Sequence, residues 1–333
     1  MTDVLRRALL GLPEVDATAA AAVAERAANT LRPTGALAAL DAVAVHLAGW
    51  QQTTRPAVRR PAVLVFAGDH GVAGAGVSNY PADITAAMLA AVQQGRATVN
   101  AMAAAAGASV TAVDAGVGRP TGDIRVEPAL TAERFDEICV TAFAHVDELA
   151  AAGTDLLILG ELGIGNTTVA AALATALAGV PIADSVGRGT GVDDDGLARK
   201  CAAVEQAARR VAGVDDPLEV LRQIGGAELV GMAAACAQAR RHRLPVLLDG
   251  YVVTAAVLPL AGALDHCLAA HVSAEPGHRR VLDHLGLAPL LALDLRLGEA
   301  TGALAALPLL KLACRAVTDT ATFAEWFGEV APR

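Results

Sequence analysis

The sequence predicts a doubly wound α/β fold built on a mostly parallel β-sheet. A short apolar run, a polar Gly-rich loop and an Ala-rich stretch long enough for a helix follow one another several times. Hydrophobic residues make up 54% of the chain and charged residues 18%, which is enough apolar surface for a large core. Aromatic residues make up only 3%, so this core consists mainly of Ala, Val and Leu, as in helices packed closely on a parallel sheet.

The expected helices and strands follow in chain order. Residues 14–50 are Ala-rich and predict helix, with a break at 32–35, and a polar linker at 55–60 comes next. Strands are expected at residues 62–67, 110–113, 155–159 and 246–248, each before a loop with glycine or acidic residues. Because ligands of such sheets bind at the carboxyl ends of the strands, these loops are expected to meet at one cleft.

One uncharged stretch has the composition of a membrane span. Residues 162–183 carry no charge, but they begin with a polar Gly-rich loop. The apolar part, residues 169–180, is too short to cross a bilayer. A buried helix is therefore expected, and no membrane association.

Charge and cysteine usage exclude other classes of protein. The net charge of −9 would repel a phosphate-rich polymer, so no nucleic-acid partner is expected. No cleavable apolar segment is seen at the start of the chain, and no two cysteines form a CxxC pair. We expect reduced, mostly buried thiols in a cytoplasmic protein. The five cysteines are Cys139, Cys201, Cys236, Cys267 and Cys314.

The loop at residues 160–168 combines three spaced glycines with Asn and Thr before an Ala-rich helix. Asn166 and Thr167 can cap this helix, whose free N–H groups would then face a phosphate. A plain glycine-rich turn with a cap explains the same residues equally well. Glu161, at the end of the expected strand, could accept a hydrogen bond from a ribose hydroxyl.

The loop at residues 187–195 resembles a dinucleotide fingerprint only in part, since the last glycine of GxGxxG is missing. Contact with a phosphate is one interpretation. The acidic residues 193–195 could suggest a metal site, but the start of a helix is favoured because Asp is common in first turns. Lys200 could reach a carboxylate or a phosphate, although alone it is more typical of a surface lysine.

Two further motifs contain histidine. Asp69 and His70 lie between glycines, and without spaced partners they are poor evidence for a metal. A structural role is favoured, with Asp69 organising the loop and His70 as a satisfied polar residue. Residues 273–278 predict a turn, with His278 as a ligand or acid in a less favoured interpretation.

Glu299 stands among small residues at the end of an apolar run, within residues 296–302. A ligand would meet few steric obstacles there, and partial burial would raise the pKa of the carboxyl group toward that of a useful base. A glutamate that caps the helix from Gly302 onward is the alternative, and it is favoured when this motif is taken alone.

Together these motifs resemble the nicotinate-nucleotide–dimethylbenzimidazole phosphoribosyltransferase family of cobalamin lower-ligand assembly. Each motif alone is weak, but their joint presence in family order, from about Arg32 to Arg315, is specific. The matching stretches are FAGDHGVAGAGVSNYP at 66–81, ELGIGNTT at 161–168, GRGTGVDD at 187–194, IGGAE at 224–228, PVLLDGYVVTAA at 245–256, SAEPGH at 273–278 and RLGEATGA at 296–303.

The resemblance implies transfer of phosphoribose from nicotinate mononucleotide to dimethylbenzimidazole or a related base, giving α-ribazole phosphate and nicotinate. It implies a homodimer, no cofactor and no metal. It also implies a small helical domain from the chain termini, with residues 1–55 and 301–333 flanking an α/β nucleotide-binding domain at 56–300.

The resemblance also assigns the site residues, with Glu299 as the catalytic base. It places the nucleotide on Glu161, Gly163, Gly165, Asn166, Thr167, Gly187, Arg188, Gly189 and Lys200. It places the base on Asn79, Tyr80, Ala87, Met88 and Leu297. The chain departs from the family pattern at Ala87, where relatives usually carry Gln, and at Ala300, where they usually carry Gly.

The chemistry requires few protein groups. The pyridine ring of nicotinate mononucleotide leaves as a neutral nitrogen base, so no general acid is needed. When a benzimidazole attacks with one ring nitrogen, its other N–H becomes acidic and a carboxylate must take the proton. No pyrophosphate leaves, so the usual reason for Mg²⁺ in phosphoribosyl transfer does not apply.

Three alternatives remain open. The altered loops are compatible with a non-catalytic nucleotide-binding paralogue, although such a protein would not need Glu299. A phosphoribosyltransferase with a different azole or aromatic acceptor is the second. A nicotinamide-dependent dehydrogenase is the third, although an intact GxGxxG does not follow the first strand.

Overall fold

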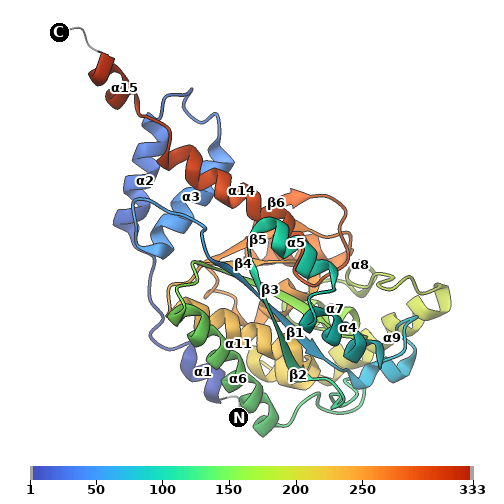
Figure 1. The fold of residues 1–333 in the computed structure, drawn as a ribbon. Helices are drawn as coiled ribbons and strands as arrows, with labels where there is room; N and C mark the ends of the chain where they lie inside the picture. The colour runs from blue at the N-terminus through green and yellow to red at the C-terminus, as the bar shows by residue number, and fades with distance from the viewer. Residues whose placement is uncertain (1–2, 331–333) are drawn as a thin grey trace.

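A computed structural model describes residues 3–330 and shows six parallel strands in one sheet, in the order β2-β1-β3-β4-β5-β6 (Figure 1). The chain moves outward from β1 to β2 and then continues on the other side of β1 with β3, which makes a topological switch point between β1 and β3. The strands are β1 (Pro61–Gly68), β2 (Ser109–Gly116), β3 (Leu156–Leu162), β4 (Val246–Leu248), β5 (Cys267–Val272) and β6 (Pro289–Ala292).

The four expected strands correspond to β1, β2, β3 and β4, so the predicted pattern is confirmed. The sequence did not indicate β5, which contains His271 and lacks a long apolar run. The side chains of β1 and β3 are buried along their whole length, which explains why both strands consist of near-continuous apolar residues.

Helices cover both faces of the sheet, as the doubly wound prediction requires (Figure 1). One face is covered by α1 (Asp3–Ala8), α6 (Ala132–Ala151), α7 (Asn166–Ala178), α9 (Asp194–Arg210), α10 (Pro217–Ile224), α11 (Ala227–Arg241), α12 (Tyr251–Ala256) and α13 (Gly277–Leu285). The other is covered by α3 (Ala38–Gln51), α4 (Ile84–Gln93), α5 (Thr98–Ala106) and α14 (Thr301–Thr318). The shorter or outlying helices are α2 (Ala17–Asn29), η1 (Gly71–Ala75), α8 (Ile182–Ser185), η2 (Leu258–Leu260) and α15 (Phe323–Val330).

Helices from both ends of the chain meet beside the sheet. A small apolar cluster joins α2, α3 and the end of α14, and α15 extends beyond it (Figure 1). In contrast, α1 packs against α6 and α11. The division into residues 1–55, 56–300 and 301–333 stays a prediction.

Two helices, α14 and α7, are strongly apolar, and the first is also long enough to span a membrane. Among the described residues, α14 is long and apolar enough to cross a bilayer by length and composition, but 56% of its apolar window is buried. It packs against α3, α5 and β5, as a core helix does. The uncharged residues 162–183 contain α7, and most of its side chains are buried, so the expected buried helix is confirmed.

Candidate active site

A cleft of about 590 Å³ opens at the carboxyl ends of the strands. The loops that follow β3, β4, β5 and β6 line it, together with part of α4 and the segment after β1. The expected convergence on one cleft is therefore present for the loops after β3 and β4 and for the segment after β1. The loop after β2, at residues 114–116, was expected there too, but it lines a separate hollow. The position agrees with the rule that open α/β sheets bind ligands beyond the carboxyl ends of their strands.

The structure brings most of the residues assigned from the sequence to this cleft. Those that line it are Tyr80, Met88, Glu161, Gly163, Gly165, Asn166, Thr167, Gly189, Leu297 and Glu299. Five others lie around it without being part of the wall: Asn79, Ala87, Gly187, Arg188 and Lys200.

The loop after β3 presents the N-terminus of α7 to the cleft. Gly165 occupies the cap position with a φ of +99°, and no side chain among the described residues caps the helix. The predicted capping by Asn166 and Thr167 is therefore wrong. Asn166 instead donates its amide hydrogen to Glu161, and Thr167 accepts a hydrogen bond from Lys200 at 3.1 Å. This arrangement leaves the start of α7 open to an anion.

Lys200 is buried, in contrast to the surface position that its sequence context favours. Its Nζ donates to the carbonyl oxygen of Gly187 at 2.8 Å and to Thr167 Oγ1 at 3.1 Å. Burial lowers the pKa of the amine, while the nearby carboxylate of Glu275 acts in the opposite direction. The lysine thus joins the glycine loops at residues 160–168 and 187–195 and places a positive charge next to both.

Asn79 and Arg188 both contribute contacts to the glycine loop at residues 187–195. Asn79 donates its backbone N–H to Thr190 at 3.1 Å and its amide to the carbonyl of Gly191 at 2.8 Å. Arg188 is exposed and pairs with Asp194 at 2.6 Å. The acidic stretch begins α9 as expected, with the first of its aspartates as the cap residue.

Helix α4 contributes only one of its faces to the cleft. Thr85 and Met88 line the wall, whereas Ala87 is exposed to solvent beside them. A role of Ala87 in binding the base stays a prediction. Tyr80, on the segment before α4, lines the same wall and is 55% exposed.

Glu299 lies between β6 and α14 and is only 3% exposed. Gly298, Glu299 and Ala300 all have left-handed backbones, with φ values of +84°, +58° and +67°. Burial raises the pKa of the Glu299 carboxyl group, and the nearby charge of Asp249 raises it further. Within residues 3–330, its Oε2 atom has no hydrogen-bond partner. The cleft wall thus carries a carboxylate with a free oxygen and an increased affinity for protons.

Two more carboxylates gather beside Glu299. Burial raises the pKa of Glu161 well above its usual value, and the charges of Asp249 and Glu228 add to this shift. Asp249 accepts a hydrogen bond from the backbone of Ala303 at 2.7 Å and lies 3.6 Å from His271. Sequence reasoning assigned no role to Asp249, although the Asp-Gly pair that directly follows β4 was a usable signal.

The two histidine motifs have structural roles, as the sequence favoured, but His70 is not fully satisfied: its Nδ1 atom has no hydrogen-bond partner among the described residues. Asp69 accepts a hydrogen bond from the backbone of Gly118 at 2.7 Å, and His70 lies 2.6 Å from Glu228 with both side chains fully buried. His278 accepts a hydrogen bond from the backbone of Ser273 at 2.9 Å. Burial lowers the pKa of His278 to about 3, so it is neutral at physiological pH.

Comparisons with known proteins decide what kind of site this is. The sequence profile of the family described as "Phosphoribosyltransferase" matches residues 12–326. The chain belongs to this phosphoribosyltransferase family. It is 45% identical over 324 residues to the nicotinate-nucleotide–dimethylbenzimidazole phosphoribosyltransferase of Novosphingobium aromaticivorans, covering 96% of this chain and 94% of the relative. The enzyme of the same name from Rhizobium etli is 46% identical over 328 residues, covering 97% of this chain and 96% of the relative.

Solved structures agree with the sequence relationship. The crystal structure of CobT from Thermus thermophilus superposes with a TM-score of 0.89 at 41% identity, covering 93% of this chain and 98% of that one. A second structure from the same organism, named as the nicotinate-nucleotide–dimethylbenzimidazole enzyme, gives the same TM-score at 39% identity and covers 96% of this chain and 100% of that one. The α/β fold of this phosphoribosyltransferase is therefore shared along nearly its whole length.

Proposed function

We propose that this phosphoribosyltransferase transfers phosphoribose from nicotinate mononucleotide to dimethylbenzimidazole or a closely related base. The relatives are nicotinate-nucleotide–dimethylbenzimidazole phosphoribosyltransferases, which supports these two substrates. The products are α-ribazole phosphate and nicotinate. The observation that carries the proposal is the Glu299 carboxyl group, buried in the cleft wall with one unpartnered oxygen and a raised pKa.

In the proposed reaction, one ring nitrogen of the benzimidazole attacks C1′ of the nucleotide while the bond from C1′ to the pyridine nitrogen breaks. The bond electrons stay on the pyridine nitrogen, so nicotinate leaves without needing a proton. The second ring nitrogen of the benzimidazole loses its proton to Glu299. Because the pKa of Glu299 is raised, this carboxylate is a stronger base than a glutamate in water.

The nucleotide phosphate is proposed to bind at the start of α7. Gly163 and Gly165 allow close approach of the backbone there, and the helix dipole favours negative charge. The buried amine of Lys200 supplies the compensating charge from below the two glycine loops. Glu161 lines the cleft next to this loop, in a position suited to a ribose hydroxyl.

The acceptor base is proposed to bind between Met88 and Leu297, near Glu299. The side chains of Ile84 and Leu162 add further apolar surface to the cleft lining. A wall of this kind favours methylated, apolar azoles over hydroxylated ones, because an unpaired polar group typically costs about 1–3 kcal/mol when buried.

The test is a measurement of nicotinate release from nicotinate mononucleotide, with and without dimethylbenzimidazole, together with the mass of the nucleotide product. Release that depends on the benzimidazole and yields α-ribazole phosphate is the expected result. Nucleotide binding without release would instead identify a non-catalytic paralogue. Release with other azoles only would identify a different acceptor.

Association into a homodimer is also proposed. Helix α15 carries Phe323, Trp326 and Phe327 with 44%, 47% and 61% of their surface exposed, which is unusual for large apolar side chains. Sedimentation equilibrium of the wild type gives the number of chains directly, and a monomer at all concentrations would refute this proposal.

A further inference from the structure

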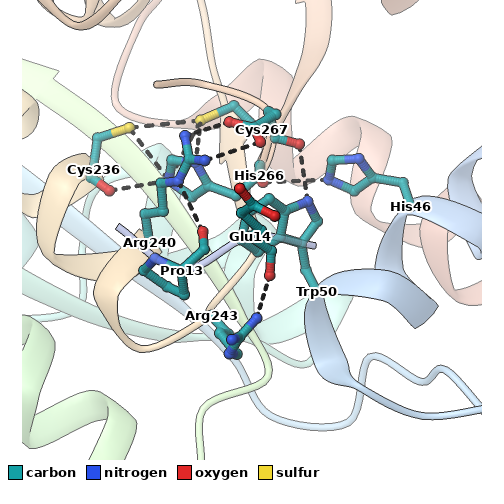
Figure 2. Close-up of polar contacts among 10 residues, drawn as sticks. Pro13, Glu14, His46, Trp50, Cys236, Arg240, Arg243, His266 and Cys267 are labelled. Atoms are coloured by element: carbon teal, nitrogen blue, oxygen red, sulfur yellow. Dashed lines mark hydrogen bonds and ion pairs between the residues drawn. The ribbon is translucent and has the colours of Figure 1, made fainter. Parts of the chain in front are cut away.

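A compact group of two cysteines and a histidine lies far from the cleft, at the opposite end of the sheet. Cys236 is on α11, and His266 and Cys267 stand where β5 begins (Figure 2). Cys267 pairs with Val246, the first residue of β4, so the group marks the amino ends of these strands. All three side chains are buried, with exposed fractions of 0% for Cys236 and His266 and 4% for Cys267.

The distances among the three donor atoms match those of ligands around a single metal ion. The two Sγ atoms are 3.5 Å apart, and the Nε2 atom of His266 lies 3.7 Å from each of them. Around tetrahedral zinc, bond lengths of about 2.3 Å to sulfur and about 2.0 Å to nitrogen separate two sulfurs by about 3.8 Å and a sulfur from a nitrogen by about 3.6 Å. The triangle in this protein therefore has the size of one face of a zinc coordination sphere.

The charges around the group also suit a bound cation. The guanidinium group of Arg240 approaches the cluster but is paired with Asp265 at 3.0 Å, so this pair adds no net charge. The thiolate is the form of cysteine that binds metals. Once both cysteines lose their protons, the two buried thiolates need a compensating dication, because isolated buried charges are strongly unfavourable.

We propose that Cys236, His266 and Cys267 form a structural binding site for a thiophilic divalent cation of the zinc class. Both thiols lose their protons to solvent when the ion binds, and the two thiolates neutralise its charge. The Nε2 atom of His266 lies 3.0 Å from the carbonyl oxygen of Cys236, so its proton must move to Nδ1 before Nε2 can bind the ion. This carbonyl oxygen or a water molecule would complete the coordination.

The position of the site indicates its role. Trp50 on α3 donates a hydrogen bond to the backbone of Asp265 at 2.9 Å, and His46 on the same helix lies 3.3 Å from the carbonyl of His266. An ion held by α11 and β5 would thus fix α3 as well, and it would join the terminal helices to the sheet. Because the cleft lies at the other end of the strands, the ion takes no part in the proposed transfer reaction.

The spacing of the cysteines hides this site from sequence reasoning. Cys236 and Cys267 are 31 positions apart, so they do not form the short CxxC pair typical of zinc sites. The family resemblance implies no metal, so a structural ion at this end of the sheet would depart from that expectation.

The experiment uses the full chain without a histidine tag, reduced, stripped with a chelator and dialysed. Titration with Cd²⁺ as the probe, followed by the thiolate-to-cadmium charge-transfer band, is expected to saturate at one ion per chain, and Zn²⁺ is expected to displace it. Cys236→Ala and Cys267→Ala should each weaken cadmium binding by more than about tenfold. Loss of a residue that only supports a metal ligand already weakens binding by about 10–100-fold, so loss of a ligand itself should cost at least as much. Cys139→Ala is the matched control, because Cys139 is equally buried and stands outside the cluster.

Zn²⁺ should also raise the thermal midpoint of the wild type and of Cys139→Ala, but not of the two cluster variants, while transferase activity stays unchanged. If the variants fail to fold, X-ray absorption of the zinc-loaded wild type is expected to show two sulfurs and two nitrogen or oxygen atoms at bonding distance. A wild type that binds no ion overturns the proposal. Cadmium binding that survives Cys267→Ala also overturns it. So does a metal-free wild type whose mass is lower by two hydrogens, because this would identify a disulfide between the two cysteines.

Discussion

The two helices that begin at the cleft, α7 and α14, solve the same geometric problem with different residues. Each has a cap residue with a left-handed backbone: Gly165 with a φ of +99° and Ala300 with a φ of +67°. Glycine adopts this conformation without strain, whereas for alanine it costs roughly 1–2 kcal/mol. The loop proposed to bind phosphate is therefore relaxed, and the loop that carries Glu299 is strained.

Packing explains how the strained loop persists. Ala300 is fully buried, and a Cβ atom on Gly160 of β3 would lie only 2.7 Å from the Ala300 nitrogen. A Cβ on Gly298 would collide with the carboxylate of Glu161. The neighbouring strand thus holds Glu299 in position against the local preference of its backbone. The comparison shows that the loop proposed to bind phosphate depends on its own glycines, whereas the loop that carries Glu299 depends on its surroundings.

The largest effect is expected from Glu299→Gln, which keeps the shape of the side chain and removes its basicity. Turnover should fall by about 10²–10⁴-fold, the usual loss of a general base, while nicotinate mononucleotide still binds. Single-turnover kinetics and calorimetry measure the two quantities separately. Turnover near the wild-type rate would contradict the assignment of the base and leave the strain of this loop without a catalytic reason.

The next effect is expected from Gly165→Val on the relaxed loop. A Cβ at Gly165 meets only ordinary contacts, at 3.5 Å and beyond, so the penalty comes from forcing valine to a φ of +99°. The displaced N–H groups should weaken nicotinate mononucleotide binding by about 10–100-fold, the value of one hydrogen bond to a charged group. Calorimetry gives the affinity.

The control for this variant is Gly179→Val at the other end of α7. Gly179 also has a left-handed backbone, with a φ of +64°, and a Cβ there would meet nothing within 4 Å among the described residues. It should lower the thermal midpoint similarly without changing nucleotide affinity. Equal affinity losses in both variants would mean that Gly165 acts through stability alone.

The sequence predicted the positions of strands and loops better than the environments of single side chains. Buried parallel strands are apolar along their length, so β1 and β3 and the loops after them could be located without a structure. The environment of a single side chain could not: Lys200 is buried by packing of α9 on α7, which leaves no mark on local sequence. The capping role expected of Asn166 failed for a related reason, since the backbone places Gly165 at the cap position and Asn166 already inside α7.

The pH dependence sharpens the comparison, because only the strained loop carries the proposed proton acceptor. Glu299 acts as a base when deprotonated, so kcat/KM should fall about tenfold per pH unit below its pKa. Since burial raises this pKa, the acid limb should begin at a higher pH than for a free glutamate. The limb should disappear in Glu299→Gln but persist in Gly165→Val, and a limb present in Glu299→Gln would assign it to another group.

The same pKa shift has a consequence for stability. A folded-state pKa above the unfolded value favours the neutral carboxyl group in the folded protein. This contribution is fully present below the unfolded pKa and is lost as the pH rises through the folded pKa. Glu299→Gln should therefore gain stability relative to the wild type as the pH rises through this window, in denaturant titrations at several pH values.

The smallest effect is expected from exchanging the two cap residues. Ala300→Gly relieves roughly 1–2 kcal/mol of backbone strain, but it gives up about 0.8 kcal/mol for a buried methyl group and about 0.4–1 kcal/mol in unfolded-state entropy. These terms nearly cancel, so the free energy of unfolding should change by less than about 1 kcal/mol. Gly165→Ala adds strain with little new burial, and it should lose about 1 kcal/mol. Urea titrations of both variants decide the comparison: a clear gain in stability for Ala300→Gly would show that packing does not offset the strain that holds Glu299 in place.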